Sequence, residues 1–176
     1  MLARTRAELA ALSWFSSVGQ PPTDAEAAEA RAYLTGVDAG APGALRWVAD
    51  WAEAERVLRD PAGADWWAAE ARLHEATLAA LGPVAKSPAF VSALNESVHG
   101  VSDIVMGAAA LAAARAGLAE QAVIRVAAGA AGETAEQVMA LRLAGLAADH
   151  PFEIKRRLYA GGRWLLGMVS GALVVF

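Results

Sequence analysis

Residues 87–117 read SPAFVSALNESVHGVSDIVMGAAALAAARAG, and this stretch decides the fold class. Ser87 followed by Pro88 is typical of a helix start, because the hydroxyl caps free backbone amides and proline has no amide to satisfy. Gly117 predicts the end of the helix. A helix of this length spans about 40 Å, which is enough to cross a domain of this size.

Apolar or small residues recur along this stretch in alternating steps of four and three, which is the spacing of one face of an α-helix. They are Phe90, Leu94, Ser97, Val101, Ile104, Ala108 and Leu111. We therefore expect this face to be buried against other helices.

The whole chain has 176 residues, a hydrophobic content of 56%, a net charge of −4 and no cysteine. The length predicts a single domain, residues 1–176, with room for a real core. The lack of cysteine excludes disulfides, thiolate zinc sites and cysteine nucleophiles. The mildly acidic balance offers no electrostatic basis for binding nucleic acid.

No run of about 18 uncharged apolar residues occurs, so we expect no membrane span and a soluble protein. A cytoplasmic location fits the absence of cysteine. A partner of this chain is then expected to be a protein, and the high apolar content favours a second copy.

The remaining sequence predicts further helices separated by glycine, proline and aspartate. Their expected ranges are 2–15, 23–34, 51–58, 66–81, 119–128, 133–148 and 151–159. Thr23 and Glu26 have the spacing of a capping box, and Asp50 is a side-chain cap. Gly129 and Gly132 are interpreted as a break between two helices.

The pattern changes to β-favouring residues at the C-terminus, where residues 161–176 read GGRWLLGMVSGALVVF. Two strands, 163–169 and 172–176, are predicted with a tight turn at Ser170 and Gly171. A hairpin that is apolar on both faces has to pack on the helices, pair with a third strand, or pair with a second molecule. The candidate third strand is 45–48. The predicted fold is therefore mainly α, a multi-helix bundle of seven to eight helices with a small C-terminal β-hairpin, 163–176, packed on it.

The predicted core takes one apolar face from each element. Its members are Leu9, Leu12, Leu34, Val57, Leu73, Phe90, Leu94, Val101, Ile104, Leu111, Ile124, Val138, Leu141 and Trp164. Trp51, Trp66 and Trp67 are expected in the core or at a subunit interface, with a tryptophan-lined ligand pocket as the alternative.

One group of side chains predicts chemistry: Glu96, His99 and Asp103 share a helical face, and so do Glu70 and His74. If the two helices pack antiparallel, these side chains meet and form a metal site for Fe, Mn or Zn. Glu133 and Glu136 are possible further ligands, or simply acidic residues near a helix start. In the alternative interpretation, Glu96 and Asp103 only flank a partly buried histidine.

A second group is basic and consists of Lys155, Arg156, Arg157 and Arg163. It is interpreted as solvated charge or as charge that complements a helix C-terminus, with an acidic partner or a phosphate as the alternative.

No catalytic set and no phosphate-binding loop is recognisable in the sequence. The leading hypothesis is therefore a non-enzymatic structural or protein-interaction module that forms a homo-oligomer. Its basis is the high apolar content together with the terminal hairpin that is apolar on both faces, since exposed apolar surface usually marks a partner surface. The competing hypothesis is a metal-dependent enzyme with a site at Glu70, His74, Glu96, His99 and Asp103. The sequence does not identify a cofactor.

Overall fold

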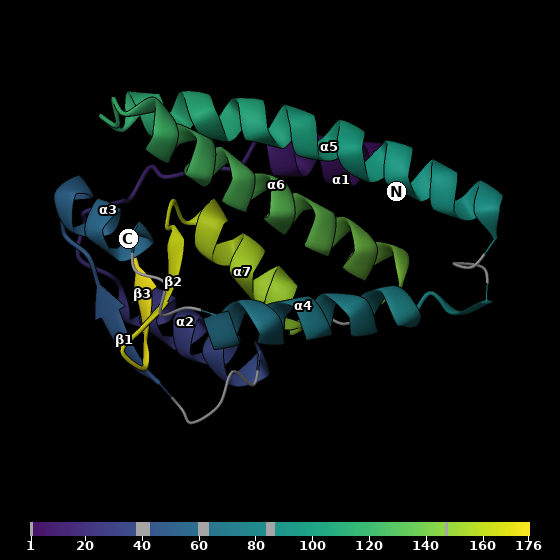
Figure 1. Cartoon of the computed structure of the whole chain (residues 1–176), viewed down its shortest axis with the longest axis horizontal. Helices are drawn as coiled ribbons and strands as arrows, with labels where there is room; N and C mark the ends of the chain where they lie inside the picture. The colour runs from purple at the N-terminus through teal and green to yellow at the C-terminus, as the bar shows by residue number, and fades with distance from the viewer. Residues whose placement is uncertain (1, 38–42, 60–63, 84–86, 147) are drawn as a thin grey trace.

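The computed structural model describes residues 2–37, 43–59, 64–83, 87–146 and 148–176. Within these residues the chain forms seven helices and three strands, so the predicted mainly α fold is confirmed. The helices are α1 Leu2–Ala10, α2 Asp24–Val37, α3 Trp51–Leu58, α4 Ala64–Ala79, α5 Pro88–Arg115, α6 Gln121–Leu143 and α7 Pro151–Ala160. The strands are β1 Ala44–Trp47, β2 Leu165–Val169 and β3 Ala172–Val175. Figure 1 shows α5 and α6 side by side along one side of the molecule and α4 on the opposite side.

Three predicted helix caps are confirmed. Asp50 accepts a hydrogen bond from the Glu53 amide at 2.8 Å, and Ser87 accepts one from the Phe90 amide at 3.2 Å. Thr23 and Glu26 form the reciprocal capping box, with the Thr23 amide 2.7 Å from Oε2 of Glu26. These local side-chain contacts satisfy amides that a helix leaves free, which is why the sequence locates the starts well.

The predicted break at Gly129 and Gly132 is wrong, because α6 runs through both glycines. A Cβ on Gly132 would lie 2.7 Å from Oγ of Ser102 and 2.8 Å from Cγ of Met106, both on α5. Gly132 therefore lets α5 and α6 approach closely. The packing gained by this approach offsets a glycine penalty of about 1 kcal/mol in a helix.

The first helix is also shorter than predicted. It ends at Ala10, and the chain then turns so that Trp14 and Phe15 enter the core. The Phe15 ring packs against Tyr159 and Trp164, with ring centroids 6.1 Å and 5.3 Å away.

The three strands form one sheet in the order β1-β3-β2. β3 pairs antiparallel with β2 through a turn in which both Ser170 and Gly171 have positive φ, as a type I′ hairpin turn requires. β1 pairs parallel with β3, with Leu45 opposite Leu173, so the predicted third strand is confirmed. Leu173 is fully buried. The terminal hairpin is thus part of the core and not an exposed surface.

Most of the predicted core residues are buried or partly buried. Leu9, Leu34, Val57, Val101, Ile124, Val138, Leu141 and Trp164 are buried, and Leu12, Leu73, Phe90 and Leu94 are half-buried. The prediction is wrong for Ile104 and Leu111, which are 39% and 52% exposed. The face of α5 that packs on the protein consists instead of Val101, Ser102, Val105, Ala109 and Ala113.

The basic group is not free charge as predicted, because each of its members makes an ion pair within the protein, and only Arg157 of the four keeps a largely accessible side chain, 37% exposed. Lys155 pairs with Glu70, Arg156 with Glu153, Arg157 with Glu29, and Arg163 with Glu26. Arg163 is buried and also donates to the carbonyls of Ser17, Gln20 and Pro21 at 2.7–3.0 Å. This arginine fastens the chain between α1 and α2 to the start of the hairpin.

Candidate functional site

A buried polar cluster joins α2, α4, α6 and α7. Nζ of Lys155 lies 2.6 Å from Oε1 of Glu70 and 3.1 Å from Oε1 of Gln137. The Tyr33 hydroxyl donates a hydrogen bond to the same Glu70 oxygen. Gln137 extends the hydrogen-bond network to a second carboxylate, because its Nε2 donates to Oε1 of Glu133 at 3.2 Å. Four helices thus hold the ammonium of Lys155 and the carboxylate of Glu70 in the interior, with the half-buried carboxylate of Glu133 beside them.

Burial changes the acid–base properties of this cluster. It raises the pKa of the Tyr33 hydroxyl, and the Glu70 charge adds to the effect. It also raises the pKa of Glu133, which the ammonium of Lys155 partly opposes. Oε2 of Glu70, Nε1 of Trp66 and the Tyr159 hydroxyl are buried without a hydrogen-bond partner among the described residues. Burying these three polar groups without a hydrogen bond lowers the stability of the fold, so the packing around them has to hold them in place.

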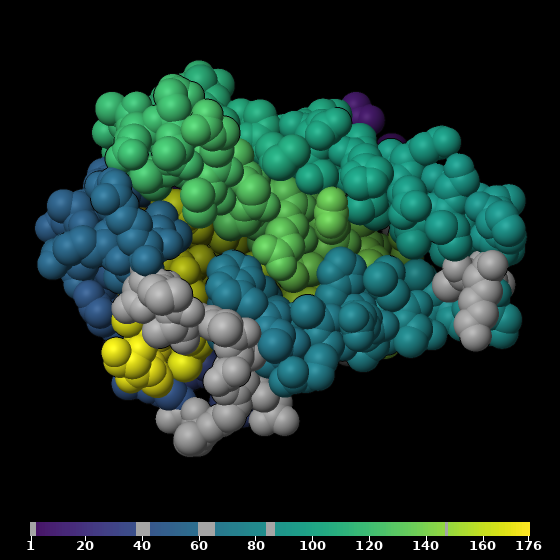
Figure 2. Space-filling model, viewed as in Figure 1, coloured from purple at the N-terminus to yellow at the C-terminus, as the bar shows by residue number. Residues whose placement is uncertain are grey.

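A pocket of about 170 Å³ lies next to this cluster, between α4, α5 and α6. It is lined by His74 and Leu78 of α4, by Leu94, Asn95, Val98 and His99 of α5, and by Glu136 and Ala140 of α6. Figure 2 shows the green surface of α6 between the teal surfaces of α5 and α4. The two histidines that the sequence singled out thus reach the same pocket.

His74 is a half-buried member of this pocket. Burial lowers the pKa of its imidazole, and the carboxylates of Glu136 and Glu70 oppose that change. The ring is therefore neutral at pH 7 and has a lone pair that can accept a proton or bind a metal. Its edge faces Phe152, with the ring centroids 6.0 Å apart.

The five predicted metal ligands do not gather at one point. The Glu70 carboxylate accepts hydrogen bonds from Lys155 and Tyr33, whereas Glu96, His99 and Asp103 are exposed on α5. Among the described residues, no group of three or more His, Asp or Glu side chains has the geometry to hold a metal ion. Of the predicted set, the structure brings only His74 and His99 into one pocket, and it adds Glu136.

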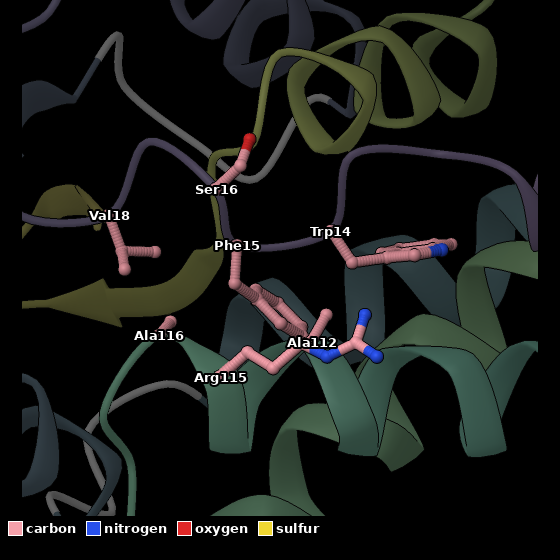
Figure 3. A pocket seen from close by; sticks show the side chains of 7 residues that line it. All are labelled: Trp14, Phe15, Ser16, Val18, Ala112, Arg115 and Ala116. Carbon is pink, nitrogen blue, oxygen red and sulfur yellow. The ribbon is translucent and has the colours of Figure 1, made fainter.

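A second pocket, of about 360 Å³, lies at the C-terminal end of α5. Figure 3 shows Arg115 and Ala112 of α5 facing Trp14 and Phe15 from the segment after α1. Trp14 and Phe15 are themselves buried, so the pocket is shallow and its charged side chain is Arg115.

Ile104 and Leu111 are exposed on the outer face of α5, which we define as Glu96, Gly100, Asp103, Ile104, Gly107, Leu111 and Ala114. No residue from 104 to 114 is charged. Of the helices in the described part of the chain, α5 has the length and composition that could cross a membrane, yet its most apolar stretch is only 28% buried. A core helix of this composition would be mostly covered. The outer face is therefore apolar surface without a partner in the described structure.

Sequence reasoning missed several members of the buried cluster. Tyr33 and Gln137 carry no motif, and Lys155 is placed by the sequence in a solvated basic group. The pairing of Lys155 with Glu70 spans 85 positions, which helical periodicity cannot detect. Glu70, Glu133 and Glu136 did have a signal, because their spacing along the helices predicted possible ligands.

Comparisons with known protein families, with curated proteins and with solved structures find no match for this chain. Its function is therefore argued from its own geometry.

Proposed function

We propose that this protein is a non-enzymatic structural or interaction module that self-associates through the outer face of α5. The supporting observation is the exposure of Ile104 and Leu111 on a helix face without charge from 104 to 114. Large apolar side chains gathered on one surface favour association, because pairing removes them from water. The proposal places the interface on α5 and not on the terminal hairpin, whose strands are buried.

The oligomeric state tests this proposal. We expect light scattering to report a dimer for the unmodified protein and a monomer for Leu111→Asp, since a carboxylate at the centre of an apolar interface loses its hydration. Val91→Asp is the matched control, because Val91 is 40% exposed on the same helix. It points about 160° away from Leu111 around the helix axis, so the dimer should persist.

Two results contradict the proposal. The first is a monomeric unmodified protein at concentrations up to the millimolar range. The second is binding of a monomer to lipid vesicles through α5, which would make the outer face a membrane surface and not a protein interface.

A metal-dependent enzyme is the second candidate, supported by the convergence of His74, His99 and Glu136 on one pocket. Two imidazoles and a carboxylate are ligand types that suit Zn, Fe or Mn, and a metal would have to draw these three side chains closer together than they lie in the described structure. This candidate predicts near-stoichiometric metal in protein purified without a histidine tag, and loss of that metal in His74→Ala and His99→Ala. Metal-free protein, or metal content that neither substitution changes, would reject it.

A further inference from the structure

We propose that two copies of this chain pair through antiparallel α5 helices, related by a two-fold axis that crosses the outer face near residue 105. This inference rests on the proposed self-association and specifies its geometry. A closed dimer of identical chains uses the same surface patch twice, so a single helix face has to be complementary to itself. The charges of Glu96 and Arg115 and the shape of the outer face favour one helix direction.

The charges on α5 are separated along its length. Glu96 and Asp103 lie in the middle of the helix, and Arg115 lies in its last turn. None of the three makes an ion pair among the described residues. In a parallel pair, Glu96 would face Glu96 of the partner and Asp103 would face Asp103. In the antiparallel pair, Arg115 of one copy lies beside Glu96 of the other, and this contact occurs twice.

The shape of the face supports the same direction. A Cβ added to Gly100 or Gly107 would meet no atom within 4 Å, so both positions are open toward solvent. With the axis near residue 105, Leu111 of one copy lies opposite Gly100 of the other, and Ile104 lies opposite Gly107. Each large side chain then fills the space left by a glycine, which is how helices pack closely.

A shallow apolar groove of about 500 Å³ continues this surface onto α1. Ala3, Ala7 and Ala10 line it together with Ile104 of α5. Arg6 is at its edge and makes no ion pair among the described residues. The α5 helix of the partner copy therefore meets further apolar surface beside Ile104. The Arg6 cation at the edge of the groove is within reach of the acidic side chains on that helix.

Disulfide crosslinking tests the geometry directly, because the chain has no cysteine of its own. Ile104→Cys places the two thiols next to the axis, within the distance that a disulfide spans. Ala114→Cys places them about 26 Å apart along the antiparallel helices. We therefore expect oxidation to crosslink Ile104→Cys into a covalent dimer and to leave Ala114→Cys uncrosslinked.

The possible outcomes separate the two proposals. A dimer that crosslinks at both positions has parallel helices, and a dimer that crosslinks at neither position uses another surface. Each of these results overturns the antiparallel pairing, and the parallel case leaves self-association through α5 intact. A monomer overturns both proposals.

Charge reversal gives an independent test of the register. Glu96→Arg sets two arginines against each other at both ends of the interface, and we expect it to weaken dimerisation roughly tenfold. Combining Glu96→Arg with Arg115→Glu restores opposite charges and should restore most of the affinity. Arg31→Glu, at an exposed position of α2, is the control and should change the affinity less than about twofold. A double variant that dimerises no better than Glu96→Arg overturns the proposed register.

Discussion

Replacing Lys155 by methionine is expected to lower the free energy of unfolding by about 3–5 kcal/mol. The side chains of Lys155 and Glu70 are only 3% and 1% exposed, so the substitution leaves a carboxylate in the interior without its cation. Tyr33 still donates to Oε1 of Glu70, but Oε2 already lacks a partner. Water cannot compensate for the lost ammonium at this depth, which is why the expected cost is large.

Urea unfolding followed by circular dichroism measures this effect. Arg46→Met is the matched control, because it removes the cation of an exposed pair with Glu53 whose Nη2–Oε1 distance is also 2.6 Å. The exposed pair should contribute less than about 1 kcal/mol. The double variant Glu70→Gln/Lys155→Met should be more stable than Lys155→Met, since it removes the unpaired charge. Equal costs for Lys155→Met and Arg46→Met would show that the buried pair has no special role.

The same cluster shows why the site was harder to predict than the fold. The sequence locates helix starts because a cap is a contact over three residues, as at Asp50 and Glu53. A buried ion pair such as Glu70 with Lys155 depends on how α4 and α7 are placed relative to each other. Local periodicity carries no information on that placement. The predicted metal ligand Glu70 therefore has a structural partner that no spacing rule reveals.

The rotation of α5 was mispredicted for a different reason. Alanine occupies positions on all sides of the helix between Ile104 and Arg115, so more than one face satisfies the apolar spacing. The largest side chains, Ile104 and Leu111, suggested one face, but close approach to α6 at Gly132 selects the face of small residues. On this part of the helix the large side chains of Ile104 and Leu111 are exposed, whereas small side chains such as Ala109 and Ala113 are buried. That conflict leaves Ile104 and Leu111 exposed.

Replacing Arg163 by methionine should lower the free energy of unfolding by about 3 kcal/mol. Its guanidinium lies 2.8 Å from Oε1 and 3.0 Å from Oε2 of Glu26, a charge-assisted pair with two hydrogen bonds. The substitution would also leave the carbonyls of Ser17, Gln20 and Pro21 without this donor. Chemical denaturation at pH 7 measures the loss. Arg59→Met is the control, because its pair with Glu55 is largely exposed.

The pH dependence of stability then separates the ion pair from simple packing. Hydrogen bonds from Arg163 lower the pKa of Glu26 from 4.5 to about 2 in the folded state. The unfolded chain therefore binds this proton at a higher pH than the folded chain does. The stability contributed by Glu26 is present above pH 4.5 and is lost as the pH falls toward 2. In Arg163→Met the pKa of Glu26 returns toward 4.5, so this variant should lose less stability than the unmodified protein between pH 6 and pH 3. If both proteins lost the same amount, the guanidinium would contribute through packing and not through the charge of Glu26.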